Sequence, residues 1–164
     1  PVPDADVLSA FSHVHPRAQN IIRHGQNWKL WVLCDRDPVG TWTDGRVVLL
    51  GDAAHPTLQY LAQGACMAME DGVCLSIEMA AHPDNPEAAL ISYQNRRRVR
   101  TARIQLTSRE IGDHIYHPAG VHATLRNSIM SAKSDAEWYD VLDWLYGAQH
   151  SDAAAATGPL VEVA

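Results

Sequence analysis

The sequence predicts a layered α/β fold, and three observations lead to that prediction. The stretch "RVVLLG", residues 46–51, contains an unbroken apolar run, which is typical of a strand buried on both faces in a parallel sheet. Two long segments with helical features, about 64–81 and 86–111, follow it. Hydrophobic residues make up 46% of the 164 residues, enough for a domain-sized core. Helices packed on a sheet satisfy all three observations.

The first elements are predicted from apolar spacing and its interruptions. Apolar residues recur at helical spacing from about residue 4 to residue 24, but Pro16 interrupts them, so we expect two short helices. The segment "WKLWVLCD", residues 28–35, is apolar and aromatic and lies between Gly25 and Pro38, which favours a strand. Asp44-Gly45 predicts a turn before the apolar run.

The second half is predicted to be helical. A helix is expected from Gly64 to Ala81, with Glu70 and Asp71 interrupting its apolar face. Pro86 suits the first turn of a helix that reaches about residue 111. Its five arginines favour a solvated face, partly paired with acidic groups, over an anion site: Arg96, Arg97, Arg98, Arg100 and Arg103. An irregular and then helical stretch follows, and Ser134 or Asp135 caps a short last helix.

Composition and charge exclude several function classes. The formal net charge is -6, so we predict neither a nucleic-acid partner nor a membrane partner. Three cysteines, Cys34, Cys66 and Cys74, form no C-x-x-C pair, which argues against a disulfide framework and a zinc site and favours a reducing, cytoplasmic setting. No transmembrane or signal-peptide pattern is recognisable. His114 and His117 lie three apart, but no third ligand accompanies them, so we predict no metal.

The most informative stretch is "GDAAHPTLQYLAQGACMAMED", residues 51–71. A carboxylate on Asp52, at the end of a parallel strand, lies where open α/β folds bind ligands, although a lone Gly-Asp is more often a simple cap. Gly64 lets a ligand approach the backbone closely. The amides of Ala65 and Cys66 at a helix N-terminus provide donors and a positive dipole end. The continuation therefore favours a ligand site that stabilises negative charge.

Two residues of this stretch have alternative interpretations. His55 has the chemistry of an acid or base, but a histidine before proline in a turn more often anchors the turn, and we favour that structural role. Cys66 at a helix start has the position of an activated nucleophile. No histidine and aspartate partners support it, so a backbone role is favoured.

The order strand, "GDAAHP", about ten residues and "QGACMAMEDG" resembles the second FAD-binding motif of the single-component flavoprotein aromatic hydroxylases, the family of salicylate hydroxylase and 3-hydroxybenzoate 6-hydroxylase. The flanks "WVLCDRDPVGTW" and "YQNRRRVRTARIQLTSR" are similar to the same family, so the resemblance covers about residues 6–147. "LQYLAQGACMAMED" is more similar to the 3-hydroxybenzoate branch than to the salicylate hydroxylases.

The resemblance implies a role for each matching residue. Asp52 would accept hydrogen bonds from the FAD ribityl chain, and Gly51 would leave space for that chain. Pro56 would lie beside the isoalloxazine with its carbonyl toward the place where oxygen reacts. Gln59 would reach the aromatic substrate. The backbone of three residues would face the pyrimidine edge of the flavin: Gly64, Ala65 and Cys66.

The resemblance also implies a fold, cofactors and partners. The fold is the C-terminal part of a para-hydroxybenzoate-hydroxylase-like FAD/NAD(P)-binding fold. Residues 1–44 would end the substrate-binding domain, 45–82 would form the FAD motif, 83–147 the C-terminal helices, and 148–164 a flexible tail. The whole enzyme would use FAD, NADH or NADPH, and O₂ to hydroxylate a phenolic aromatic acid, 3-hydroxybenzoate to 2,5-dihydroxybenzoate.

The sequence departs from the family in one large respect. The G-x-G-x-x-G segment that holds the ADP pyrophosphate does not occur in the chain. We therefore expect the polypeptide to be inactive alone, and to form a homo-oligomer or to associate with the missing N-terminal part. Two other functions stay open: a flavoprotein oxidoreductase acting on a non-aromatic substrate, and a non-catalytic interaction fragment.

Overall fold

The computed structural model describes residues 1–147 and divides into two compact units. The first comprises residues 1–33, and the second begins at residue 34. The flexible tail expected at 148–164 lies outside the described residues.

The first unit is a pair of short helices, as predicted. Helix α1 spans Asp4–Ala10 and helix α2 spans Pro16–Arg23. Pro16 occupies the first turn of α2, and the Nδ1 atom of His15 accepts a hydrogen bond from the Arg17 amide at 3.2 Å. Proline fits there because its missing N–H would have no partner in the helix. No residue of this unit is buried.

The strand expected over residues 28–35 is wrong. The segment has an irregular backbone, and the side chains of Leu30 and Trp31 are 83% and 76% exposed. An apolar, aromatic sequence favours a strand only where a neighbouring strand accepts its hydrogen bonds and another layer covers its side chains. In residues 1–147 the only paired strands are two short ones further along the chain.

Those two strands form a small antiparallel hairpin in place of the expected parallel strand. Strand β1 spans Thr43–Asp44, strand β2 spans Val47–Val48, and Thr43 pairs with Val48. The predicted turn is present, with Gly45 at φ +53°. Val47 is 66% exposed, so the run is not buried on both faces. A parallel strand needs partners from distant segments, and the described residues provide only the adjacent strand.

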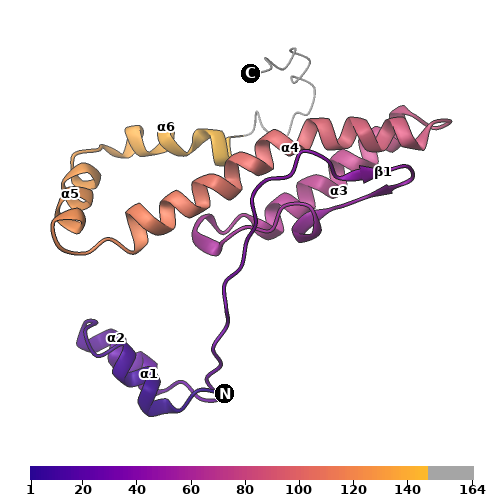
Figure 1. Ribbon diagram of the computed structural model, residues 1–164. Coiled ribbons are helices and arrows are strands. Elements are labelled where there is room, and N and C mark those ends of the chain that lie inside the picture. The colour runs from indigo at the N-terminus through magenta and orange to yellow at the C-terminus, as the bar shows by residue number, and fades with distance from the viewer. Residues whose placement is uncertain (148–164) are drawn as a thin grey trace. The chain divides into compact units, whose positions relative to one another are not determined.

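Two long helices form the framework of the second unit, with the predicted bounds. Helix α3 spans Gly64–Ala81 and helix α4 spans Pro86–Ile111. The side chain of Asn85 caps α4 by accepting from the Ala88 amide at 3.1 Å. Figure 1 shows α3 lying along α4, with the hairpin beside the pair. Both helices begin and end at local signals, which explains why pattern alone locates them.

The chain then turns back through three shorter elements. A π-helical turn, η3, spans Gly112–Tyr116, helix α5 spans Gly120–Ser131, and helix α6 spans Asp135–Tyr146. The predicted cap of α6 is Ser134, in a reciprocal capping box with Glu137. These elements extend from the far end of α4 in Figure 1.

Two small cores hold the second unit together. One contains Trp42, Ala54, Cys74 and Tyr93, which join the hairpin and the following turn to α3 and α4. The other joins α6 to the two long helices through Met67, Ile104 and Leu145. In residues 1–147 no helix is long and apolar enough to cross a membrane.

Candidate cofactor-binding turn

The acidic turn, residues 51–58, connects the hairpin to α3. It begins with a short 3₁₀ turn, η1, over Gly51–Ala53. Gly51 is buried at φ +59°, and a Cβ atom at this position would lie 3.3 Å from the Cβ of Ala68 on α3. Both the left-handed backbone and the close packing require glycine. The start of the acidic turn therefore packs directly against α3.

The side chain of Asp52 projects from the acidic turn toward the start of α3. Asp52 is exposed, and a Cβ atom placed on Gly64 would lie 4.0 Å from its Oδ1 atom and 3.7 Å from the Cγ2 of Thr57. These are ordinary van der Waals distances, so a side chain at residue 64 would occupy part of the space beside this carboxylate without a clash at its Cβ. Glycine thus keeps open a cradle between the Asp52 carboxylate and the first turn of α3.

The first turn of α3 retains its hydrogen-bonding capacity. Gln63 precedes the helix and forms no capping hydrogen bond with its side chain. The amides of Gly64, Ala65 and Cys66 therefore receive no cap from Gln63, and they lie at the positive end of the helix dipole. Ala65 is exposed and Cys66 is partly exposed. The structure thus brings an open carboxylate and a set of backbone donors together.

Beneath the acidic turn lies a buried carboxylate, Asp71 of α3. Its Oδ2 atom accepts from the Gly51 amide at 3.0 Å and lies 2.6 Å from the Nε2 atom of His55. Its Oδ1 atom accepts from the Nε atom of Arg97 at 2.7 Å. Burial alone would raise the pKa of Asp71, but hydrogen bonds from His55, Arg97 and Gly51 outweigh it and lower the pKa. Asp71 is therefore an ionised anchor.

The arginines of α4 are partly paired with acidic groups, as the sequence predicts, but Arg97 is buried, so they do not all belong to a solvated face. Arg97 is 5% exposed and pairs with Asp71 and with Glu70. Arg100 pairs with the same Glu70, and Arg96 with Glu78. These four ion pairs join α4 to α3. They arise because the acidic interruptions on α3 face the arginines of α4 when the two helices pack. Arg103 instead lies over the ring of Trp144, 3.9 Å from its centre.

Polar side chains hold the acidic turn from its other side. Arg36 donates to the carbonyls of Ala53 and Ala54 at 2.6 and 2.7 Å. Gln105 of α4 donates to the carbonyl of Pro56 at 3.0 Å and to that of Arg36 at 3.2 Å. The Pro56 carbonyl, expected to face the oxygen site, therefore already accepts one hydrogen bond and keeps one lone pair.

Gln59 lies just beyond the acidic turn. It begins a second 3₁₀ turn, η2, over Gln59–Leu61, and its side chain is exposed. The next residue, Tyr60, lies 2.7 Å from His117 through its hydroxyl, which ties η2 to the chain after η3. Ala62 ends η2 at φ +53°, an uncommon conformation for alanine that costs about 1 kcal/mol. Gln59 is therefore held on a constrained turn as an exposed residue.

His55 has the structural role that the sequence favours. The ring is 1% exposed, binds Asp71 and lies 5.4 Å from the ring of Trp42. A buried ring with these contacts anchors the turn and is closed to substrate. His117 contacts the hydroxyl of Tyr60, and His114 contacts the ring of His122. Among residues 1–147 no three potential metal ligands cluster.

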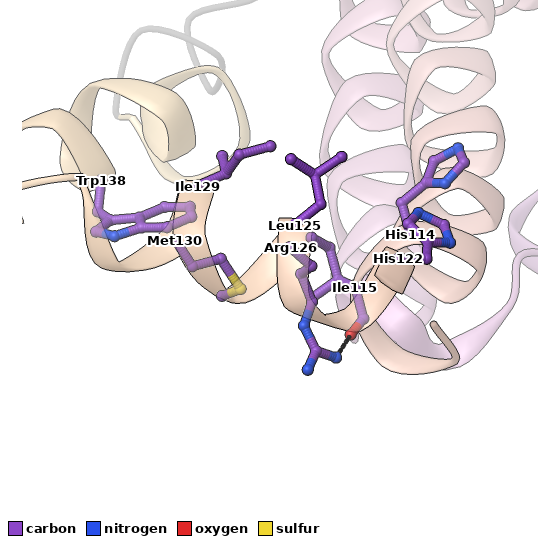
Figure 2. Close-up of a pocket in the computed structure, with 8 residues that line it drawn as sticks. All are labelled: His114, Ile115, His122, Leu125, Arg126, Ile129, Met130 and Trp138. Carbon is purple, nitrogen blue, oxygen red and sulfur yellow. Dashed lines mark hydrogen bonds between the residues drawn. The ribbon is translucent and has the colours of Figure 1, made fainter. Parts of the chain in front are cut away.

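A pocket of about 260 Å³ lies away from the acidic turn, between η3, α5 and α6. Figure 2 shows its lining: Trp138 of α6 lies at one end beside Ile129 and Met130 of α5, and the two histidines, His114 and His122, lie at the other. In this pocket the Nη1 atom of Arg126 donates a hydrogen bond to the carbonyl of Ile115 at 2.7 Å. None of the residues predicted to bind a cofactor or substrate lines this pocket.

Sequence reasoning missed the residues that support the site from below. Asp71 stood out only as an interruption of an apolar helix face, and Arg97 only as one of five arginines. A signal for this buried ion pair was nevertheless present in the sequence: acidic residues interrupt the apolar face of one predicted helix, and arginines lie on the helix that follows it. Arg36 and Gln105 carried no such signal, because they bind backbone carbonyls.

Comparison with solved structures defines the class of fold. The chain matches a variant of Klebsiella pneumoniae HpxO complexed with FAD, with a TM-score of 0.74 and 25% identity over 87% of this chain and 40% of that chain. The fold is thus one found in FAD-binding flavoproteins.

The chain belongs to the FAD binding domain family, which matches residues 13–108. It is 48% identical to 3-hydroxybenzoate 6-hydroxylase 1 of Aquipseudomonas alcaligenes, over 90% of this chain and 37% of that protein. It is 39% identical to 3-amino-4-hydroxybenzoate 2-monooxygenase of Streptomyces cremeus, over 87% of this chain and 35% of that protein. The chain therefore spans a little over a third of the length of these curated relatives.

Proposed function

We propose that the whole protein is an FAD-dependent aromatic hydroxylase and that this segment supplies its second FAD-binding motif. The convergence of the Asp52 carboxylate with the uncapped start of α3, across the space kept open by Gly64, carries this proposal. A carboxylate fits the hydroxyls of a ribityl chain, and helix amides fit an electron-rich flavin edge. The donor set of the turn thus suits FAD.

The residues take the following roles. Asp52 accepts hydrogen bonds from the ribityl hydroxyls, and Gly51 keeps the backbone out of their way. The amides of Gly64, Ala65 and Cys66 bind the pyrimidine edge. When bound, FAD reduced by NADH or NADPH supplies the electrons that activate O₂ for ring hydroxylation. Pro56 borders the place where oxygen reacts, with Gln105 fixing its carbonyl.

We further propose that the substrate is a hydroxylated aromatic acid, 3-hydroxybenzoate converted to 2,5-dihydroxybenzoate. The named relatives act on hydroxybenzoates, and identity is higher to the 3-hydroxybenzoate 6-hydroxylase than to the 3-amino-4-hydroxybenzoate enzyme. Gln59 is exposed on its constrained turn and carries an amide, which can hydrogen-bond to a phenol or a carboxylate. In this proposal Gln59 therefore orients the aromatic ring of the substrate.

The rest of the proposal concerns the assembled protein. Residues 1–44 belong to the substrate-binding side, and residues 46–51 pair in parallel with strands contributed by another part of the protein or by a second copy. Apolar side chains on these segments, such as Trp31 and Val47, are exposed in the part of the chain that the structure describes. Association with further strands would cover this apolar surface and pair the free backbone groups of the strand edge, which supports the proposal. We place the enzyme in the cytoplasm.

The test is product analysis with the full-length protein. Purified protein with FAD is given NADH, and NADH oxidation is measured with and without 3-hydroxybenzoate, and with a non-aromatic acid as control. We expect 3-hydroxybenzoate to stimulate NADH oxidation and 2,5-dihydroxybenzoate to accumulate. Stimulation by non-aromatic compounds alone would favour a different oxidoreductase, and absence of flavin binding would favour a non-catalytic role.

A further inference from the structure

One carboxylate oxygen holds the acidic turn at two points. The Oδ2 atom of Asp71 contacts the amide of Gly51, at the start of η1, and the ring of His55, four residues later. Between these anchors lies Asp52, the proposed ligand of the flavin. Asp71 itself is 0% exposed, so it does not face the cradle at the start of α3. Asp71 therefore affects the position of Asp52 only through its hydrogen bonds to the acidic turn.

The chemistry of the contacts fixes the direction of each hydrogen bond. An ionised carboxylate only accepts, so the Nε2 atom of His55 carries the proton that it shares with Asp71. Arg97 donates to the other oxygen, so both oxygens of Asp71 accept hydrogen bonds. The Nδ1 atom of His55 is buried without a partner among the described residues. The ring therefore depends on Asp71 for its polar anchoring.

We propose that Asp71 is the positioning residue of the acidic turn, and that it sets the Asp52 carboxylate against the first turn of α3 by holding Gly51 and His55. This inference rests on the proposed function. Glycine at φ +59° has no preference of its own for that conformation, so the turn needs an external restraint. Asp71 provides it, and Arg97 neutralises the charge that Asp71 brings into the interior.

The test begins with Asp71→Asn and a matched control. An amide has the same shape but offers one acceptor oxygen and a donor, so it cannot accept from both the turn and Arg97. Glu70→Gln removes the same charge from the neighbouring residue of α3, also beside Arg97, but the ion-pair partners of Glu70 in the described residues are Arg97 and Arg100 of α4 and not groups of the turn. In the full-length protein we expect Asp71→Asn to weaken FAD binding about tenfold or more. Glu70→Gln is expected to change it less than about twofold.

A double-mutant cycle separates positioning from general destabilisation. The dissociation constant for FAD is measured by flavin fluorescence in the wild type, Asp52→Ala, Asp71→Asn and the double variant. If Asp71 acts through Asp52, its removal costs little once Asp52 is gone, so the two effects do not add. A merely structural loss would multiply the two factors. Should Asp71→Asn fail to fold, His55→Leu replaces it, since it removes one anchor and leaves the Arg97 pair in place.

The outcomes discriminate between the two levels of the proposal. Weakened FAD binding in Asp71→Asn, an unaffected Glu70→Gln and a non-additive cycle support the positioning role. Wild-type FAD affinity in Asp71→Asn, an equal loss in Glu70→Gln, or full additivity would overturn it while leaving the proposed function standing. A wild-type protein that binds no FAD would reject the proposed function and this inference together.

Discussion

Two carboxylates serve the acidic turn from opposite sides, and their surroundings give them different tasks. Asp52 is exposed and free to meet a ligand, whereas Asp71 is buried and ionised among donors. The sequence motif predicted the first, because Gly-Asp after an apolar run is a local pattern. It could not predict the second, since the partners of Asp71 lie up to 26 residues away in the chain.

The exposed residue Gln59 leads to a prediction about how efficiently NADH oxidation is coupled to hydroxylation. Gln59→Ala in the full-length protein should lower the amount of hydroxylated product formed per NADH consumed, because a misplaced ring loses the geometry that positioning provides. The lost reducing equivalents should appear as hydrogen peroxide. FAD content should not change, since Gln59 is not a proposed flavin ligand. Product, peroxide and NADH are measured together.

Full coupling at an unaltered rate would leave Gln59 as a solvent-facing residue of η2. It would also remove the main residue-level reason for assigning 3-hydroxybenzoate as substrate.

Individual elements were predictable where their signals are local. The bounds of α3 and α4 follow from Gly64, Asn85 and Pro86, which mark helix ends by backbone freedom, side-chain capping and a missing N–H. The strands expected over 28–35 and 46–51 depend on partners distant in sequence, which no local pattern can supply. In the described residues only Thr43–Asp44 and Val47–Val48 pair, because two adjacent segments can close a hairpin by themselves.

Helix α6 allows a prediction at this scale. Ser134→Ala should lower the free energy of unfolding by about 1 kcal/mol, since it removes the side chain that accepts from the Glu137 amide. Ser131→Ala, at the exposed last residue of α5, is the control and should change stability little. Urea unfolding of the full-length protein measures both. Equal stability of the two variants would show that the capping box does not hold α6.

Helices α3 and α4 of the second unit are joined by ionised pairs, which makes the stability of the unit depend on pH. Burial would raise the pKa values of Asp71, Glu70 and Glu78, but hydrogen bonds from neighbouring groups, the arginines of α4 among them, outweigh it and lower all three. A lowered pKa in the folded state stabilises the protein above the unfolded pKa, and that stabilisation disappears as the pH falls through the folded value.

The free energy of unfolding should therefore stay constant near neutral pH. It should decline below about pH 4.5, where these carboxylates begin to take up protons in the unfolded chain. Urea titrations from neutral to acidic pH measure it. The Arg97→Met variant, which removes the partner shared by Asp71 and Glu70, should show a shallower decline. A wild-type stability independent of pH over this range would contradict the assigned ion pairs.

The central claim is that the acidic turn and the start of α3 bind FAD, and the affinity of the full-length protein for FAD tests it most directly. Titration of the apoprotein with FAD, followed by flavin fluorescence, should show saturable binding in the wild type. Asp52→Ala should weaken it by about 1.5 to 3 kcal/mol, roughly ten- to a hundredfold, through loss of charge-assisted hydrogen bonds. A wild type without FAD binding, or an Asp52→Ala variant that binds FAD with undiminished affinity, would contradict the claim.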